Sequence, residues 1–421
     1  MGALDAETRA TRAMARCDVI AAFTTEPGRI TRPYGSLALV QARDTIAEWM
    51  EQCGLATRVD AIGTLRGLYP GDDPVARKLL IGSHIDSVRD AGRFDGVLGV
   101  MIAIAALEDQ GGDHRLPFPV EIVAFPDEEG LRFQTTYLGS AALAGAFDPA
   151  WLDLTDDDGS TLREAVLQCG GDSTRVADAK LQPDEAFAYL EAHIEQGPRL
   201  EATGCALGAV TAISGQTRIN VRFTGEAGHA GTVPMAMRRD PAPAAAALVL
   251  AAESLAHKTP ELLATVGRIA TDPGASNVIP GSVALTLDVR HPLDEVRTDA
   301  VKALHHLATE LAMTRGLDLD WRIMRDHSAT PCDPTLTVMI QRAAADAMGA
   351  PAPALPSGAG HDAVTMAEAV PAGMMFVRCR GGISHNPAES VSVEDVATAI
   401  RALDNILDRL ADEARGQEPS R

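Results

Sequence analysis

The sequence has few of the features that mark membrane, secreted or nucleic-acid-binding proteins. It contains no apolar run of membrane-spanning length and no basic segment followed by an apolar core near its start. Asp and Glu outnumber Lys and Arg, 58 against 37, and the net charge of −21 argues against nucleic-acid and anionic-membrane partners. The six cysteines form no C-x-x-C pair, so neither a disulfide framework nor a cysteine zinc cluster is indicated. We therefore expect a cytoplasmic protein with reduced thiols.

Length and composition indicate a globular chain with more than one domain. The 421 residues exceed the size at which a single hydrophobic core stops growing, so two domains are expected. Apolar residues make up 46% of the chain and charged residues 23%, which is ordinary soluble composition and allows a core of full size.

The most informative stretch begins with a short apolar run. Residues 79–81 predict a buried strand, and residues 97–107 predict a helix. His84, Asp86 and Asp95 lie between them, at and just beyond the strand's carboxyl end, where open α/β sheets place their chemistry. Imidazole and carboxylate groups bind metals, and a carboxylate can orient a ligating histidine. A surface ion pair is the alternative interpretation of the same residues.

A second strand ends in another group of carboxylates. Residues 119–125 predict this strand, and Asp127, Glu128 and Glu129 follow it. Strand, helix and strand make a βαβ unit, whose parallel crossover sets the two carboxyl ends side by side. One glutamate can then bind a metal while its neighbour faces the reaction centre, although a solvated acidic turn is the common alternative.

The remaining pattern predicts an α/β catalytic domain with an insertion. For the catalytic domain we expect helices at 36–53, 136–190, 335–348 and 393–410, a hairpin at 56–68 and a strand at 373–377. Strands and helices alternate from residue 214 to 328, the size of an inserted α+β domain. We therefore predict a catalytic domain at 1–213 and 329–421, an insertion at 214–328, and a frayed tail at 416–421.

Three histidines and two carboxylates stand out as metal ligands: His84, Asp95, Glu129, His193 and His385. If Asp95 is shared, each of two divalent cations has three protein ligands and keeps open positions for water and substrate. Glu128 remains free to take a proton from that water.

These residues belong to segments that resemble the amidase branch of the dinuclear zinc aminoacylase and carboxypeptidase superfamily. That branch holds allantoate amidohydrolases, ureidoglycolate amidohydrolases and N-carbamoyl-L-amino acid hydrolases. The resemblance runs in order from residue 30 to residue 410 and is carried by His84-Ile-Asp86 with Asp95-Gly96, Asp127-Glu-Glu-Gly130, His193-Ile-Glu-Gln-Gly197, Gly228-His-Ala-Gly-Thr-Val-Pro234, Arg238-Arg-Asp-Pro241, Ser276-Asn-Val-Ile-Pro-Gly281, Asp288-Val-Arg290, Ser357-Gly-Ala-Gly-His-Asp362 and Ile383-Ser-His-Asn-Pro-Ala-Glu389.

The resemblance implies a fold and two ligand sets. The catalytic domain would be dinuclear-metal exopeptidase-like, with a mixed sheet flanked by helices, and the insertion would be an α+β lid and dimerisation domain. One cation would be held by His84, Asp95 and His193, and the other by Asp95, Glu129 and His385, with no departure from the family pattern at any ligand.

Further roles also follow from the resemblance. Glu128 would be the general base and later the acid, and Asp86 would orient His84. His229 would reach the active site of the partner subunit in a homodimer and stabilise the developing oxyanion. A surface histidine after a glycine turn is the structural alternative for His229.

Several residues are expected to contact the substrate. In relatives, four positions contact the substrate, and this chain has Gln196, Gln216, Asn277 and Arg290 at those positions. Arg290 suits a carboxylate because guanidinium binds that group bidentately, although a structural ion pair at a strand end is its alternative role. Backbone N–H groups near Gly358 could bind the same carboxylate, and His361 lies beside them.

The substrate is narrowed to ureido compounds that carry a carboxylate. Residues 214–218, with polar Gln216 and Arg218, look more like allantoate amidohydrolases than carbamoylases. Allantoate is therefore the predicted substrate, with N-carbamoyl-L-amino acids and ureidoglycolate as alternatives, and with Zn²⁺, Mn²⁺ or Co²⁺ as the two metals. A catalytically silent binding protein and an aminopeptidase are the rival classes.

Overall fold

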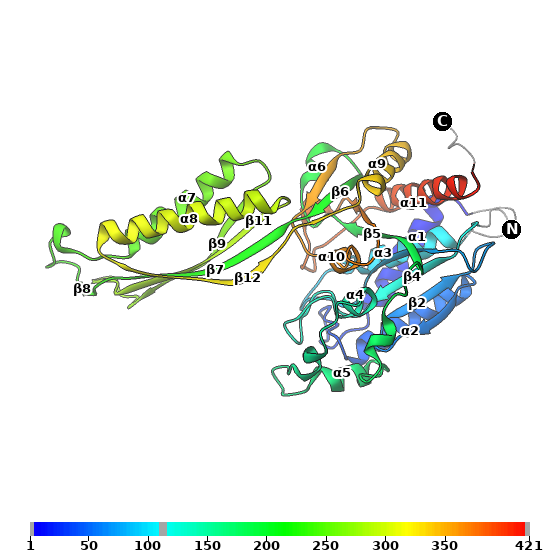
Figure 1. The fold of residues 1–421 in the computed structure, drawn as a ribbon, viewed down its shortest axis with the longest axis horizontal. Helices are drawn as coiled ribbons and strands as arrows, with labels where there is room; N and C mark the ends of the chain where they lie inside the picture. Colours follow the sequence, from blue (N-terminus) through cyan, green and yellow to red (C-terminus); the bar gives the residue numbers. More distant parts are fainter. Residues whose placement is uncertain (1–3, 109–115, 417–421) are drawn as a thin grey trace. The chain divides into compact units, whose positions relative to one another are not determined.

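The computed structural model describes residues 4–108 and 116–416, so the predicted tail lies outside it beyond Gly416 (Figure 1). The chain forms two compact units. The first comprises Met1–Thr211, Cys332–Leu355 and Gly360–Arg421, and the second comprises Ala212–Pro331 with Pro356–Ala359. Both ends of the predicted 214–328 insertion lie within the second unit, which also takes up a short segment after residue 355.

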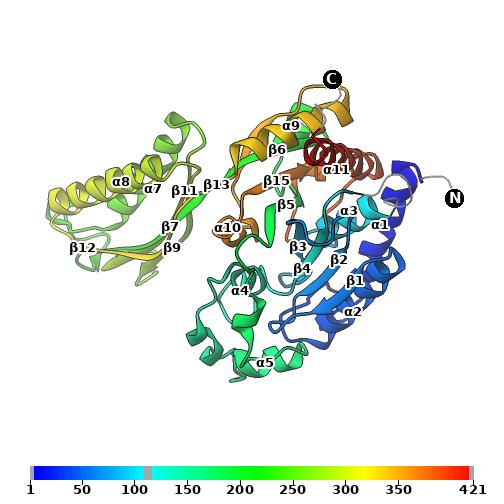
Figure 2. The same cartoon turned by 45° about the vertical axis from the view of Figure 1, so that its right-hand side comes forward.

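A nine-stranded mixed sheet forms the centre of the first unit (Figure 2). β3 (Lys78–His84) pairs in parallel with β4 (Val120–Phe125) and with β5 (Ala186–Ile194), and β5 pairs in parallel with β15 (Ala372–Val377). The predicted βαβ crossover is therefore confirmed, with His84 opposite Phe125 at the carboxyl ends. The strands run in the order β1 (Ala56–Val59), β2 (Leu65–Tyr69), β4 (Val120–Phe125), β3 (Lys78–His84), β5 (Ala186–Ile194), β15 (Ala372–Val377), β6 (Leu207–Ile213) and β13 (Thr330–Pro331), with β14 (Ala354–Ser357) paired to β6.

Helices complete the first unit. Every residue of α3 (Val97–Leu107) is buried, as expected for a helix that is apolar on all sides, and α3 packs with α1 (Ala6–Ala21) and α11 (Val393–Ala414). α4 and α10 contact each other, and α10 also contacts β5 and β15. The helices are α1 (Ala6–Ala21), α2 (Leu37–Gln52), α3 (Val97–Leu107), α4 (Leu138–Ala144), α5 (Leu162–Gln168), α6 (Arg199–Thr203), α9 (Pro334–Met348), α10 (Ala363–Met366) and α11 (Val393–Ala414), with short 3₁₀ turns at Pro149–Asp153, Val176–Ala179 and Arg380–Gly382.

Two elements differ from the sequence-based expectation. The helical prediction for 136–190 is wrong at its end, because Ala186–Ile194 forms β5, a strand buried on both faces whose apolar run has no distinctive period. The sequence pattern also did not predict α1, since buried Arg9 and Arg16 interrupt its apolar periodicity. Their guanidinium groups pair with Asp404 and Glu108.

A buried ion cluster joins three strands of this sheet. Glu121 of β4 is 2% exposed and pairs with Arg66 of β2 at 2.6 Å and with Lys78 of β3 at 2.9 Å. Burial alone would raise the pKa of Glu121, but these two cations outweigh it and hold the pKa below its ordinary value. Its stabilising effect is therefore present near neutral pH and is lost as the pH falls through the acid range.

Glu121→Ala is expected to lower the free energy of unfolding by about 3–5 kcal/mol, because it leaves a buried guanidinium without its carboxylate. The measurement is urea unfolding followed by far-UV circular dichroism. Arg58 is the matched control, since it is mostly exposed and lies 3.4 Å from the same carboxylate. Arg58→Ala should cost less than about 1 kcal/mol. Equal effects from the two variants would contradict the stabilising role of the buried Glu121 carboxylate.

The second unit is a four-stranded antiparallel sheet with two helices. β12, β7, β11 and β9 pair in that order, and α7 and α8 pack on one face (Figure 1). Along β7, buried Ile219 and Val221 alternate with exposed Asn220 and Arg222, so the other face is polar. The elements are β7 (Gly215–Thr224), β8 (Gly228–His229), α7 (Ala242–Lys258), β9 (Leu263–Asp272), β10 (Val278–Ile279), β11 (Ser282–His291), α8 (Asp294–Arg315) and β12 (Asp318–His327), with a 3₁₀ turn at Met235–Met237.

No helix in the described part of the chain is long and apolar enough to cross a membrane.

Candidate metal centre

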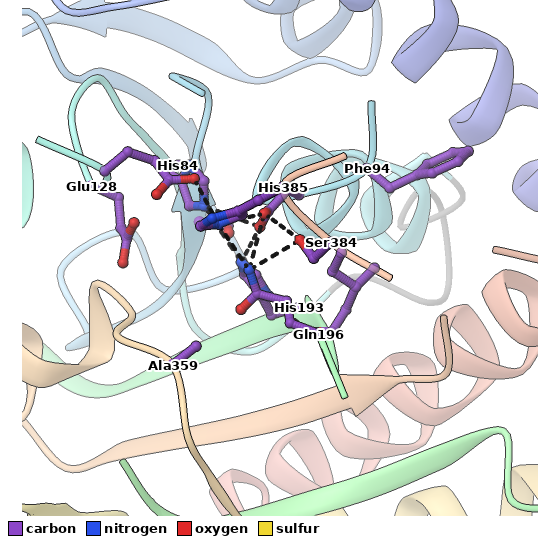
Figure 3. Close-up of polar contacts among 12 residues, drawn as sticks. His84, Phe94, Glu128, His193, Gln196, Ala359, Ser384 and His385 are labelled. Carbon is purple, nitrogen blue, oxygen red and sulfur yellow. Dashed lines mark hydrogen bonds and ion pairs between the residues drawn. The ribbon is translucent and has the colours of Figure 1, made fainter. Parts of the chain in front are cut away.

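The five predicted ligands meet at one end of the first unit's sheet. His84 is the last residue of β3, and His193 lies near the end of β5, which pairs with β3. Glu129 follows β4, and Asp95 directly precedes Gly96, the N-cap of α3. His385 comes from the loop before α11 and points toward the same place (Figure 3). Parallel strands bring these side chains together because their carboxyl ends share one edge.

Three nitrogen and oxygen atoms form a first group. His193 Nε2 lies 3.2 Å from Asp95 Oδ1 and 3.4 Å from His84 Nε2, and His84 Nε2 lies 3.7 Å from the same Asp95 oxygen. Ligand atoms placed about 2.1 Å from a shared tetrahedral zinc ion would be roughly 3.4 Å apart. The spacing of these atoms therefore suits one cation.

A second group uses the other oxygen of Asp95. His385 Nε2 lies 3.2 Å from Asp95 Oδ2 and 3.4 Å from Glu129 Oε1. Asp95 therefore presents one oxygen to each group, which is the arrangement of a bridging carboxylate. Asp95 Oδ1 is buried and accepts no hydrogen bond in the described structure, so an acceptor that a cation would satisfy stands at the centre of the cluster.

The charges of the cluster favour a cation. Burial opposes the charge of Asp95, but the neighbouring imidazole groups of His193, His385 and His84 hold the pKa of its carboxyl well below the usual range. Burial, followed by the charge of the neighbouring Glu129, raises the pKa of Glu128 well above its ordinary value. Burial opposes a charge on His84 and His193, but the carboxylates beside them raise the pKa of both rings, so the electrostatics of the site favour positive charge between these side chains.

The far ring nitrogens fix the orientation of two histidines. His84 Nδ1 lies 3.3 Å from Asp86 Oδ1, and His193 Nδ1 lies 2.9 Å from the carbonyl oxygen of Ile194. Both rings therefore turn Nε2 toward Asp95. Glu191, His193 and His361 form another close group, which shares His193 with the first group.

Asp86 also holds the backbone beside the proposed base. Its Oδ1 accepts the N–H of Glu128 at 2.9 Å, and its Oδ2 accepts the N–H of Glu129 at 3.1 Å. A single buried carboxylate thus links β3 to the turn after β4. From the sequence, only the contact with His84 was expected for Asp86.

Gln196 contacts the cluster directly. Its Nε2 donates to Asp95 Oδ2 at 2.9 Å and to Ser384 Oγ at 3.2 Å, and its backbone has a positive φ of 55°. The predicted substrate residue therefore lies against the shared aspartate. His361 is buried, with its ring edge-on to that of His193 at 4.5 Å between centroids, and burial holds its pKa well below the ordinary value.

Three predicted substrate residues meet around Asp288 in the second unit. Gln216 Nε2 and Arg218 Nε donate to Asp288 Oδ2 at 2.7 and 3.1 Å, and Arg290 Nε donates to Oδ1 at 2.8 Å. Arg290 Nη1 also donates to the Gly358 carbonyl at 2.6 Å. The structural ion pair considered for Arg290 is thus present, and two guanidinium groups against one carboxylate leave one positive charge in excess.

The other two predicted residues of this unit are exposed. His229 and Asn277 lie in and beside the small β8–β10 ladder, where the N–H of Ala230 donates to the Asn277 carbonyl at 3.0 Å. His229 Nδ1 accepts the N–H of Gly231 at 3.0 Å, which leaves Nε2–H as the free donor of the ring.

Comparison with known proteins gives consistent matches along the chain. Residues 80–409 match peptidase family M20/M25/M40. The probable allantoate deiminase of Oryza sativa subsp. japonica is 42% identical over 420 residues, covering 92% of this chain and 86% of that protein. The N-carbamoyl-L-amino acid amidohydrolase of Geobacillus stearothermophilus is 38% identical, covering 91% and 94%. The crystal structure of a hydantoinase/carbamoylase family amidase from Burkholderia multivorans has a TM-score of 0.89 at 32% identity and covers 98% of each chain.

Proposed function

Because this chain belongs to peptidase family M20/M25/M40, in its amidase branch, we propose that it hydrolyses the C–N bond of a ureido group next to a carboxylate, with allantoate as its substrate. The observation that carries the proposal is the division of the two Asp95 oxygens between His84 with His193 and His385 with Glu129. Two divalent cations, Zn²⁺ or Mn²⁺, suit these groups.

The chain's own residues supply the proton transfers. Divalent cations bound at the two groups would lower the pKa of water and polarise the ureido carbonyl. Glu128 takes a proton from the attacking water as the C–O bond forms, and it then gives that proton to the departing nitrogen as the C–N bond breaks. The products are the amine and carbamic acid, which decomposes to ammonia and carbon dioxide.

The substrate test is ammonia release by the purified protein, stripped of metal and reloaded with Mn²⁺ or Zn²⁺. Allantoate, ureidoglycolate and a panel of N-carbamoyl-L-amino acids are compared under the same conditions. Turnover of allantoate above the others supports the proposal. Preference for a carbamoyl amino acid would keep the reaction type and overturn the substrate, whereas no turnover of any ureido carboxylate would overturn both.

Arg290 is proposed to bind the substrate carboxylate, because the Asp288 cluster keeps one unmatched positive charge. Arg290→Lys is expected to lower kcat/KM by about 10- to 100-fold, mostly through KM, since lost hydrogen bonds to a charged group cost roughly 1.5–3 kcal/mol. Metal content should not change. Arg322→Lys is the control, because Arg322 lies on the same sheet in an exposed pair with Asp320. An unchanged KM in Arg290→Lys would exclude the carboxylate role.

His229 is proposed to act on the partner's site in a homodimer. Its exposed Nε2–H is a donor suited to a developing oxyanion. Glu128→Gln and His229→Ala subunits should each be inactive alone. When the two are unfolded and refolded together, about half of the dimers contain one subunit of each kind, and one of the two sites in such a dimer has both residues intact. About a quarter of the wild-type activity should therefore return. Ammonia release measures this recovery. No recovery, in mixtures that light scattering shows to be dimeric, would exclude action in trans.

A further inference from the structure

A buried carboxylate beside the metal centre has no part in the reaction described above. Glu389 is 2% exposed and follows His385 in the loop before α11. Its Oε1 accepts the backbone N–H of Phe94 at 2.7 Å and of Asp95 at 3.1 Å. Glu389 therefore holds the main chain of the loop that carries the shared aspartate.

Ser384, on the other side of His385, holds the aspartate side chain. Its hydroxyl donates to Asp95 Oδ2 at 2.7 Å and lies 3.1 Å from Glu389 Oε2. The loop that supplies His385 thus contacts Asp95 twice, at its backbone through Glu389 and at its carboxylate through Ser384. Few positions remain open to Asp95 once both contacts are made.

Gly92 permits this close contact. A Cβ atom at Gly92 would lie 2.1 Å from Cδ of Glu389, which is closer than any two such atoms approach. Glycine is therefore required here by space rather than by backbone angle. A side chain at residue 92 would push the Glu389 carboxylate away from the loop without changing the carboxylate itself.

A second buried carboxylate at the site makes the same kind of contacts. Asp86 accepts the backbone N–H groups of Glu128 and Glu129, just as Glu389 accepts those of Phe94 and Asp95. Each carboxylate comes from a different part of the chain than the loop it holds. A metal cluster needs its ligands fixed to within fractions of an ångström, which flexible loops do not provide by themselves.

We propose that Glu389 is a positioning residue that fixes the bridging Asp95 against the loop of His385. The loop of His385 would then supply one ligand to the second ion and, through Glu389, also position Asp95, the ligand that the two ions share. The inference rests on the proposed dinuclear function. It assigns Glu389 a role through hydrogen bonds to backbone N–H groups, so an uncharged acceptor of the same shape should replace it.

The experiment measures binding of Co²⁺ and Zn²⁺ to metal-free protein by competition with a chromophoric chelator, together with the visible absorption of bound Co²⁺. Glu389→Ala should bind at least one of the two ions about 10- to 100-fold more weakly and change the Co²⁺ spectrum, the range typical of lost partners of metal ligands. Glu389→Gln keeps an acceptor oxygen and should bind as the wild type does. Gly92→Ala should resemble Glu389→Ala. Glu394→Gln, an exposed glutamate of the same region, is the control.

The outcomes separate this inference from the proposed function. If the wild type binds no pair of ions, the proposed function fails. If the wild type binds two ions and Glu389→Ala and Gly92→Ala bind them equally well, the positioning role fails alone. It also fails if Glu389→Gln is as weak as Glu389→Ala, because the charge would then matter rather than the hydrogen bonds. Should Glu389→Ala not fold by circular dichroism, Gly92→Ala and Ser384→Ala decide, and tight binding in both would overturn the role.

Discussion

Glu128→Gln is expected to lower kcat by about 10³-fold or more while the protein keeps its metals, because glutamine matches the shape of glutamate but cannot carry the proton between water and the departing nitrogen. Glu128 is 7% exposed, and its backbone is fixed by Asp86, so the substitution should leave the surrounding structure in place. Ammonia release gives the rate, and elemental analysis of the dialysed protein gives the metal content.

The metal content shows whether Glu128 acts as a base or as a metal ligand. Glu128 also lies close to His84 and Glu129 in a group whose atoms could hold an ion. Loss of an ion in Glu128→Gln would mean that this side chain is a ligand and not the base. Retention of both ions with substantial turnover would mean that a group other than Glu128 carries the proton. Glu368→Gln changes an exposed glutamate of the same unit and should leave rate and metal content unchanged.

Asp95→Ala is expected to lose both ions and to reduce turnover by more than about 10³-fold, since activation of water by a bound cation is lost with them. The reason is that Asp95 alone contributes an oxygen to each of the two groups. His385→Ala removes a ligand from the second group only, so it should retain the ion held by His84 and His193. Treatment of the wild type with a chelator should abolish turnover, and added Zn²⁺, Mn²⁺ or Co²⁺ should restore it.

Elemental analysis distinguishes the two variants. Equal loss of metal in Asp95→Ala and His385→Ala would contradict separate groups that share one carboxylate. Asp157→Asn, at an exposed position of the same unit, is the control for general effects of removing a carboxylate. Because a metal that binds only the folded chain stabilises it, the chelated wild type should also melt at a lower temperature.

The sequence was most informative where the chemistry lies next to a strand end. The run before His84 and the acidic turn after Phe125 are local patterns, and a parallel crossover between them forces their ends together. Short-range signals of this kind predicted the βαβ unit correctly, whereas the mixed sheet was expected from the family resemblance. They failed for α1, where distant carboxylates compensate the buried Arg9 and Arg16, and for β5, where burial on both faces removes any period.

What the sequence by itself predicted is the set of side chains able to bind metals and move protons, because those roles depend on residue type and on motifs within a few positions. Only the tertiary structure decided how they are held. Glu389 and Phe94 are 295 positions apart, and Arg290 meets Gln216 and Arg218 at Asp288 through the pairing of β7 with β11. Contacts of this kind follow from packing and strand register, which no local pattern encodes.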